Sequence, residues 1–186
     1  MSRPIPVFGL AGWSGSGKTT LIARLVAELT ARGLSVSTVK HAHHSFDLAE
    51  PKERDERLRA AGIRETLFAS PERWALLREL EGESEPSLDV LLRRLAPVDL
   101  VLIEGFKRYP HDKLEVHRPA NGKPLLAPDD PHIVAIASDA PLEPVRRAGQ
   151  AVPSFDLNDA DGIAEFVIAH CGLRAAALRQ MSPWPS

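Results

Sequence analysis

Short apolar runs alternate along this chain with longer stretches in which apolar residues recur every three or four positions. The short runs predict strands over 5–10, 35–40, 99–103 and 133–137, with shorter ones over 114–117 and 152–155. The helical spacing predicts helices over 20–32, over 87–95 and from 158 to 170, with Gly33, Ser87 and Asn158 as caps. Because strand–helix–strand units form right-handed parallel crossovers, we expect an α/β fold with three layers and a mostly parallel central sheet.

The middle of the chain is less regular. Two runs at 65–69 and 73–77 flank the turn Ser70-Pro71-Glu72 and predict a β-hairpin that extends the sheet. A loop is expected over 41–51, a charged surface helix over 52–61 ended by Gly62, and a long loop over 106–131 around the short strand.

Composition limits the function classes. The 186 residues predict one domain over 1–173 and a disordered tail over 174–186. A net charge of −2 gives no electrostatic reason to expect nucleic acid or an anionic membrane as partner. The single cysteine, Cys171, excludes an internal disulfide and fits a reducing compartment. Since the first six residues lack the apolar stretch of a signal peptide, a cytoplasmic protein is expected.

The most specific motif runs from Gly12 to Thr19 and spells Gly, four residues, Gly-Lys-Thr, between a predicted strand and a predicted helix. Such a loop aims backbone N–H groups at phosphate oxygens, and the helix N-terminus adds partial positive charge. Lys18 is expected to reach the β- and γ-phosphates, and Thr19 to ligate Mg²⁺. The predicted nucleotide-binding residues of the loop are Gly12, Trp13, Ser14, Gly15, Ser16, Gly17, Lys18, Thr19 and Thr20. A plain Gly/Ser turn before a helix is the alternative.

Further candidates follow the carboxyl ends of the predicted strands, where ligands bind in parallel sheets. Glu104 is expected to hold Mg²⁺ or orient a water, and Gly105 to let a phosphate approach closely. Lys40 is expected to neutralise phosphate charge. Asp139 is a candidate acceptor for the N–H groups of guanine, with a turn aspartate as the alternative. Asp99, at the opposite end of its strand, is expected to cap the strand entrance.

The segment after Lys40 holds His41, His43, His44, Phe46 and Asp47. Three interpretations stay open: a metal site, a loop that binds a second anion or holds Mg²⁺ through Asp47, and a polar loop with incidental histidines.

Together these segments resemble the family of molybdopterin-guanine dinucleotide biosynthesis adapter proteins, MobB. The resemblance rests on seven stretches: GLAGWSGSGKTTL (9–21), TVKHAHHSFD (38–47), RAAG (59–62), DLVLIEGFK (99–107), KLEV (113–116), IVAIASD (133–139) and VPSFDLND (152–159). It implies a GTP-binding protein with weak GTPase activity and a homodimer formed through an extended sheet. It also implies association with the guanylyltransferase that joins GMP to molybdopterin and with other cofactor-assembly proteins. Binding of molybdopterin itself is left open.

Carried over by position, the resemblance implies that residues 12–20 hold the triphosphate and that Thr19 and Glu104 hold Mg²⁺, with Lys40 and Asp47 flanking the site. The segment 50–55 departs from the family pattern, which leaves its role open.

Two functions from different classes remain. The first is a GTP-binding adapter that hydrolyses GTP slowly at most, with Lys18 and Glu104 as its catalytic residues, because no arginine finger is recognisable. The second is a small-molecule kinase that uses ATP, with an acceptor near Lys40 and His41. Its basic lid would come from the four residues Lys107, Arg108, His111 and Lys113.

Overall fold

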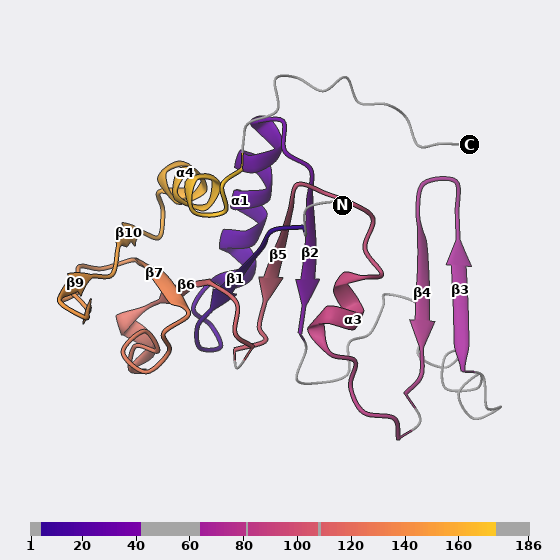
Figure 1. The fold of residues 1–186 in the computed structure, drawn as a ribbon, viewed down its shortest axis with the longest axis horizontal. Helices are drawn as coiled ribbons and strands as arrows, with labels where there is room; N and C mark the ends of the chain where they lie inside the picture. The colour runs from indigo at the N-terminus through magenta and orange to yellow at the C-terminus, as the bar shows by residue number, and fades with distance from the viewer. Residues whose placement is uncertain (1–4, 42–63, 81, 108, 174–186) are drawn as a thin grey trace. The chain divides into compact units, whose positions relative to one another are not determined.

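The computed structural model describes residues 5–41, 64–80, 82–107 and 109–173. These residues fall into two compact units, the first drawn from Met1–His41 and Arg93–Ser186 and the second from Ala42–Leu92 (Figure 1). Each unit is described by itself. The predicted loop, helix and histidines at 42–63 and the tail at 174–186 lie outside the described residues. The single domain over 1–173 stays a prediction.

The first unit is built on a six-stranded sheet whose order is β10-β7-β6-β1-β5-β2. All of its pairings are parallel. The strands are β1 (Val7–Ala11), β2 (Val36–Lys40), β5 (Leu100–Glu104), β6 (Lys113–His117), β7 (Ile133–Ser138) and β10 (Ser154–Asp156). The predicted α/β fold with a parallel central sheet is confirmed, because parallel neighbours require the crossovers that the sequence pattern indicates.

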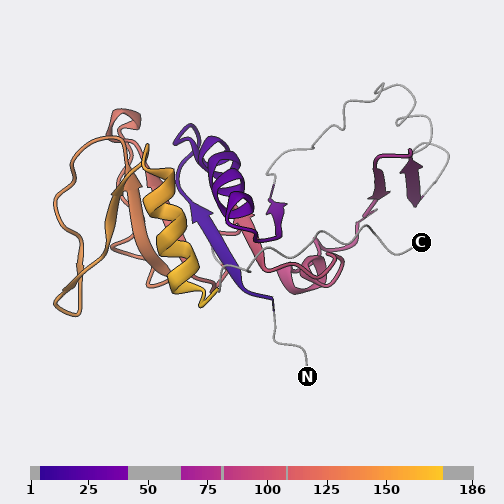
Figure 2. The ribbon, with the colours of Figure 1, turned by 90° about the horizontal axis from the view of Figure 1, so that it is seen from above.

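Two helices, α1 (Lys18–Ala31) and α4 (Ala160–His170), lie side by side against one face of this sheet (Figure 2). They bury alternate strand residues such as Phe8, Leu102 and Val116 in a continuous apolar core. Gly33 follows α1 with φ +80°, and the N–H groups of Gly33 and Leu34 donate to Thr30 and Leu29. The predicted glycine cap is therefore confirmed as a complete Schellman motif.

The cap of α4 is one residue later than predicted. Asp159 is the N-cap, and its carboxylate accepts a hydrogen bond from the N–H of Gly162 at 2.9 Å. Asn158 instead donates its own N–H to the Asp156 carboxylate at 2.8 Å, so it belongs to the preceding turn.

β6 lies in the middle of the sheet, between β1 and β7, although the sequence predicts only a short strand inside a long loop. Its two charged residues, Lys113 and Glu115, are buried with partners. Lys113 pairs with Asp130 at 3.2 Å, and the Glu115 carboxylate accepts from the N–H groups of Leu126 and Ala127. Because β6 carries Lys113 and Glu115, its sequence has the pattern of an exposed strand although the strand is central in the sheet.

Small elements complete the first unit. These are the 3₁₀ helix η1 (Pro119–Asn121) and a two-stranded ribbon, β8 (Arg146–Arg147) with β9 (Gln150–Ala151). Asp99 joins Ser35 before β5: its carboxylate accepts from the Ser35 N–H at 2.9 Å and hydroxyl at 2.7 Å. The predicted role of Asp99 at the strand entrance is confirmed.

The second unit contains the predicted hairpin. β3 (Glu65–Ala69) and β4 (Trp74–Arg78) pair antiparallel as a two-stranded sheet of their own. A single helix, α3 (Leu88–Leu92), follows in the described part of this unit. The prediction that this helix continues to residue 95 is wrong. Pro97 disfavours helical backbone just before it, and a five-residue helix gains little from further unpacked turns. No helix in the described ranges is long and apolar enough to cross a membrane.

Candidate nucleotide-binding site

The predicted phosphate loop connects β1 to α1 at the carboxyl edge of the sheet. Gly12 has φ +141°, and a Cβ placed on it would lie 2.4 Å from the Val116 carbonyl oxygen. Only glycine therefore lets the loop leave β1 so close to β6. Ser14 and Gly15 are exposed at the tip of the loop, while Ser16 is buried beneath it.

The N-terminus of α1 has free backbone donors. Its N-cap, Gly17, is in the left-handed region and provides no side-chain cap. The first N–H groups of a helix have no partner within the helix, so those of Lys18, Thr19 and Thr20 are available to an anion. An uncapped helix end after a glycine-rich turn is the arrangement that binds phosphate.

Lys18 folds back over this loop. Its Nζ donates to the carbonyl oxygens of Gly12 at 3.1 Å and Trp13 at 2.8 Å. Burial lowers the pKa of Lys18 below its usual value, and the charges of Lys107 and Lys40 add to the fall while Glu104 opposes it. Cations thus crowd the place where the motif predicts the phosphates.

Thr19, Lys40 and Glu104 meet at the ends of three segments far apart in the sequence. The Thr19 hydroxyl donates to the Glu104 carboxylate, with Oγ1 2.9 Å from Oε1 and 3.0 Å from Oε2. Lys40 lies 3.5 Å from the same carboxylate and 3.4 Å from the Thr19 hydroxyl. The structure therefore brings the three residues together, as the sequence predicts.

This donor set fits magnesium. One carboxylate and one hydroxyl at the start of a phosphate-binding helix are the protein ligands that Mg²⁺ uses together with nucleotide phosphates and water. Asp47, the other predicted ligand, lies outside the described residues.

Gly105 has a different reason to be glycine than the one predicted from the sequence. It has φ +94°, and a Cβ there would lie 2.9 Å from the Cβ of His41. His41 also donates its N–H to the Glu104 carbonyl at 2.8 Å, and its ring packs against that of Phe106, with 4.7 Å between the ring centroids and the planes tilted by 36°. Gly105 thus lets the ends of β2 and β5 approach each other, and a phosphate contact at Gly105 stays a prediction.

Trp13 packs at the rim of the loop. Its indole Nε1 donates to the Pro124 carbonyl at 2.8 Å, and Lys107 and Lys123 lie over its ring at 4.9 and 5.8 Å. Trp13 ties the phosphate loop to the segment after η1 and holds two more cations nearby.

Asp139 directly follows β7, as predicted, and forms an ion pair with Arg118 at 3.3 Å. Sequence reasoning missed Arg118. It follows β6, the strand that the sequence pattern indicated only weakly, and its Nε donates to the Ser16 carbonyl of the phosphate loop at 3.1 Å.

Two of the basic residues expected for a kinase lid are not available for that role. Lys113 is fully buried on β6, and His111 is only 9 % exposed. Burial, reinforced by the charge of Lys113, lowers the pKa of His111 to about 4, so it is neutral at pH 7. Arg108 lies outside the described residues, which leaves Lys107 beside Trp13.

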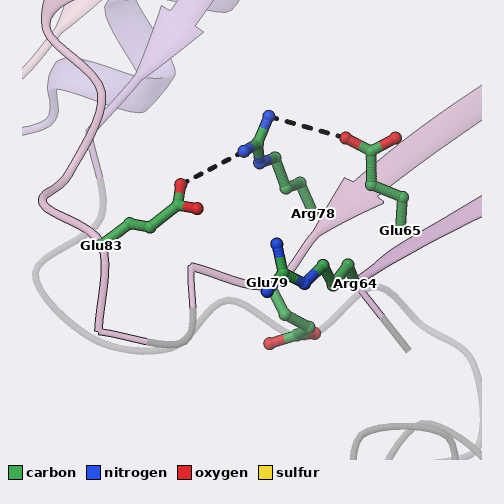
Figure 3. Close-up of a pocket in the computed structure, with 5 residues that line it drawn as sticks. All are labelled: Arg64, Glu65, Arg78, Glu79 and Glu83. Carbon is green, nitrogen blue, oxygen red and sulfur yellow. Dashed lines mark hydrogen bonds and ion pairs between the residues drawn. The ribbon is translucent and has the colours of Figure 1, made fainter. Parts of the chain in front are cut away.

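A separate pocket of about 430 Å³ lies on the hairpin unit, lined by Arg64, Glu65, Arg78, Glu79 and Glu83 (Figure 3). Arg78 lies between two of its carboxylates, 3.7 Å from Glu65 and 3.2 Å from Glu83. The lining contains none of the predicted site residues. Its ion pairs join β4 to β3 and to the segment after β4.

Fold and site together define the class of P-loop nucleotide-binding folds: a parallel sheet, a glycine-rich loop before an uncapped helix, and a hydroxyl–carboxylate pair at its start. The family model described as "Molybdopterin guanine dinucleotide synthesis protein B", MobB, matches residues 7–139. This chain belongs to the MobB family.

Individual relatives agree. The molybdopterin-guanine dinucleotide biosynthesis adapter protein of Escherichia coli (strain K12) is 40% identical over 167 residues, which cover 88% of this chain and 92% of that protein. The protein of the same name from Haemophilus influenzae is 38% identical, with 90% of each chain covered. A crystal structure of a MobB homologue from Bacillus stearothermophilus matches with a TM-score of 0.63 and 26% identity, covering 90% of this chain and 99% of that one.

Proposed function

We propose that this protein is a GTP-binding adapter in the biosynthesis of molybdopterin guanine dinucleotide, and that it assists the guanylyltransferase of that pathway. GTP binds with Mg²⁺ at the loop from Gly12 to Thr20, with Thr19 and Glu104 as the protein ligands of the metal. Lys18 and Lys40 neutralise phosphate charge. Hydrolysis is slow at most, with Lys18 and Glu104 as its catalytic groups.

The observation that carries the proposal is the contact between Thr19 and Glu104 beside the free end of α1. It joins the hydroxyl of the phosphate loop to the carboxylate that ends β5, and these are the two groups that hold Mg²⁺ in P-loop proteins. Membership in the MobB family and the names of the relatives support the pathway.

In this proposal, Asp139 is the residue that selects guanine over adenine. A carboxylate accepts hydrogen bonds from guanine N1 and N2, whereas adenine has no donor at N1. Asp139 follows β7, so it lies on the same edge of the sheet as the phosphate loop.

The partners that we propose are the guanylyltransferase, other cofactor-assembly proteins, molybdopterin, and a second copy of the chain paired through the β3–β4 hairpin. The protein works in the cytoplasm, which fits its single cysteine. The kinase alternative loses support because His111 and Lys113 are buried and cannot close over phosphates.

The test is an equilibrium titration of the full chain with GTP and with ATP, each with Mg²⁺, alongside the variants Lys18→Ala and Arg146→Ala. We expect GTP to bind more tightly than ATP. Lys18→Ala should raise the Kd about 10- to 100-fold, since a charged hydrogen bond to phosphate contributes about 1.5–3 kcal/mol. Arg146, on the β8–β9 ribbon, is the matched control because its guanidinium donates to the Gly149 carbonyl of the same ribbon and not to the phosphate loop.

Two outcomes would count against the proposal. Equal affinity of Lys18→Ala and the unaltered protein would remove the phosphate loop from the site. A preference for ATP would favour a kinase and direct the search towards phosphate acceptors.

A further inference from the structure

Arg118 stands at the centre of the site, although neither the motif nor the magnesium ligands account for it. It follows β6 directly and precedes Pro119 of η1, with φ −127° and ψ +108°. A residue before proline is held in extended backbone, so the direction in which this side chain leaves the sheet is fixed. Because β6 lies between β1 and β7, Arg118 is placed between the phosphate loop and Asp139.

The guanidinium of Arg118 lies against the end of the phosphate loop. Its Nη2, Nε and Cζ atoms lie 3.4, 3.5 and 3.8 Å from the position that a Cβ on Gly17 would take. Because the two nitrogens lie closer than the central carbon, the Nε–Nη2 edge of the guanidinium faces Gly17.

Arg118 joins two parts of the site. Its Nε donates to the Ser16 carbonyl at 3.1 Å, and its Nη1 pairs with the Asp139 carboxylate at 3.3 Å. The side chain of Arg118 is 42% exposed and that of Asp139 is 29% exposed, so neither is locked in a core. A planar cation with five N–H donors is also the side chain best shaped to bind phosphate.

We infer that Arg118 is a nucleotide-binding residue that contacts the phosphate chain, and that its ion pair with Asp139 couples the phosphate end of the nucleotide to the base end. A phosphate competes with Asp139 for the guanidinium. A base that donates to Asp139 competes with Arg118 for the carboxylate. Each end of the nucleotide therefore favours binding of the other. This inference rests on the proposed function, because it assumes a guanine nucleotide at the loop.

The experiment is a GTP titration of the full chain with Mg²⁺ for Arg118→Ala, Arg118→Lys and Asp139→Asn, and for the double variant of Arg118→Ala with Asp139→Asn. Arg118→Ala should raise the Kd about tenfold, the loss expected for one charged contact to phosphate. Arg118→Lys should recover part of the loss, because it keeps the charge but not the paired donors. The two single effects should not multiply in the double variant, since the residues are in contact.

Controls separate binding from structure and from the proposed function. The melting temperature of Arg118→Ala should match that of Arg146→Ala, another arginine removed from the same unit. If Lys18→Ala weakens GTP binding while Arg118→Ala leaves it unchanged, the role of Arg118 is overturned and the proposed function stands. An Arg118→Ala loss that comes with a lowered melting temperature and no recovery in Arg118→Lys also overturns it. If no nucleotide binds the unaltered protein, both the role of Arg118 and the proposed function are overturned.

Discussion

At the scale of single residues, His111 shows how burial changes chemistry. A Cβ on Gly9 would lie 2.3 Å from its Nε2, so the glycine of β1 makes the space for this ring. Neither ring nitrogen makes a hydrogen bond of ordinary geometry to a described residue. Burial and the charge of Lys113 lower its pKa to about 4, against a weaker opposing effect of the Tyr109 backbone, with His132 and Asp112 also nearby. The fold therefore stabilises the neutral imidazole.

The pH dependence of stability follows from this residue. Between pH 6.5 and 4 the unfolded chain binds a proton at His111 that the folded chain does not, so the free energy of unfolding falls as the pH falls. The loss amounts to roughly 3 kcal/mol over this range. His111→Phe should remove this fall in the free energy of unfolding between pH 6.5 and 4. At pH 8 it should lower the free energy of unfolding by less than about 1.5 kcal/mol. Urea denaturation at several pH values measures both quantities, and parallel slopes for the two proteins would contradict the assignment.

The residues that meet at the site were predictable where a motif specifies their spacing, and not where the contact joins remote segments. The positions of Lys18, Thr19 and Glu104 could be predicted from spacing and strand position. The pair of Arg118 with Asp139 could not, because it depends on the register between β6 and β7, which shifts between Lys113 and Leu114. No periodicity in the sequence encodes that irregularity.

At the scale of elements, the two long helices of the first unit differ in how their N-termini are capped. α4 begins with the Asp159 carboxylate on the Gly162 N–H, and α1 begins without a side-chain cap. A helix that serves only the core gains from a cap, whereas a helix that binds phosphate needs its N–H groups free. The absence of a cap at α1 therefore fits the proposed phosphate-binding site.

Asp159→Ala tests the structural side of this contrast. It should lower the free energy of unfolding by about 1 kcal/mol, because the Gly162 N–H loses its acceptor. Asp159→Asn, which keeps a side-chain oxygen at the cap, is the matched variant and should retain most of the stability. The midpoints of urea unfolding compare them. The cap would have no energetic role if both variants unfolded at the midpoint of the unaltered protein.

The bounds of the sheet strands β1, β2, β5 and β6 were predicted to within two residues, but the central position of β6 in the sheet was not predicted. β1, β2, β5 and the hairpin follow apolar alternation or continuous apolar runs. β6 carries Lys113 and Glu115 in a central strand because tertiary partners, Asp130 and the N–H groups after Leu125, satisfy them. Local pattern cannot anticipate such partners.

At the scale of the whole molecule, the β3–β4 hairpin has apolar residues on both of its faces. Leu67 pairs with Leu76 across the strands, and these two side chains are 62% and 44% exposed, with Trp74 67% exposed on the same face. The opposite face holds Phe68 and Leu77. A two-stranded sheet is marginally stable alone, so such a hairpin needs a partner surface. A second copy of the chain is the partner that we propose.

Leu67→Glu should convert a dimer to a monomer, because it buries a charge where an apolar side chain would be covered. Light scattering coupled to size-exclusion chromatography should give twice the chain mass of 20.3 kDa for the unaltered protein and that mass for the variant. Val90→Glu is the matched control, since Val90 is also exposed but lies on α3, outside the hairpin face. A dimer that persists in Leu67→Glu, or an unaltered protein that is monomeric, would place the interface elsewhere. Because GTP binding is assigned to the first unit alone, its affinity should be the same in the monomeric variant.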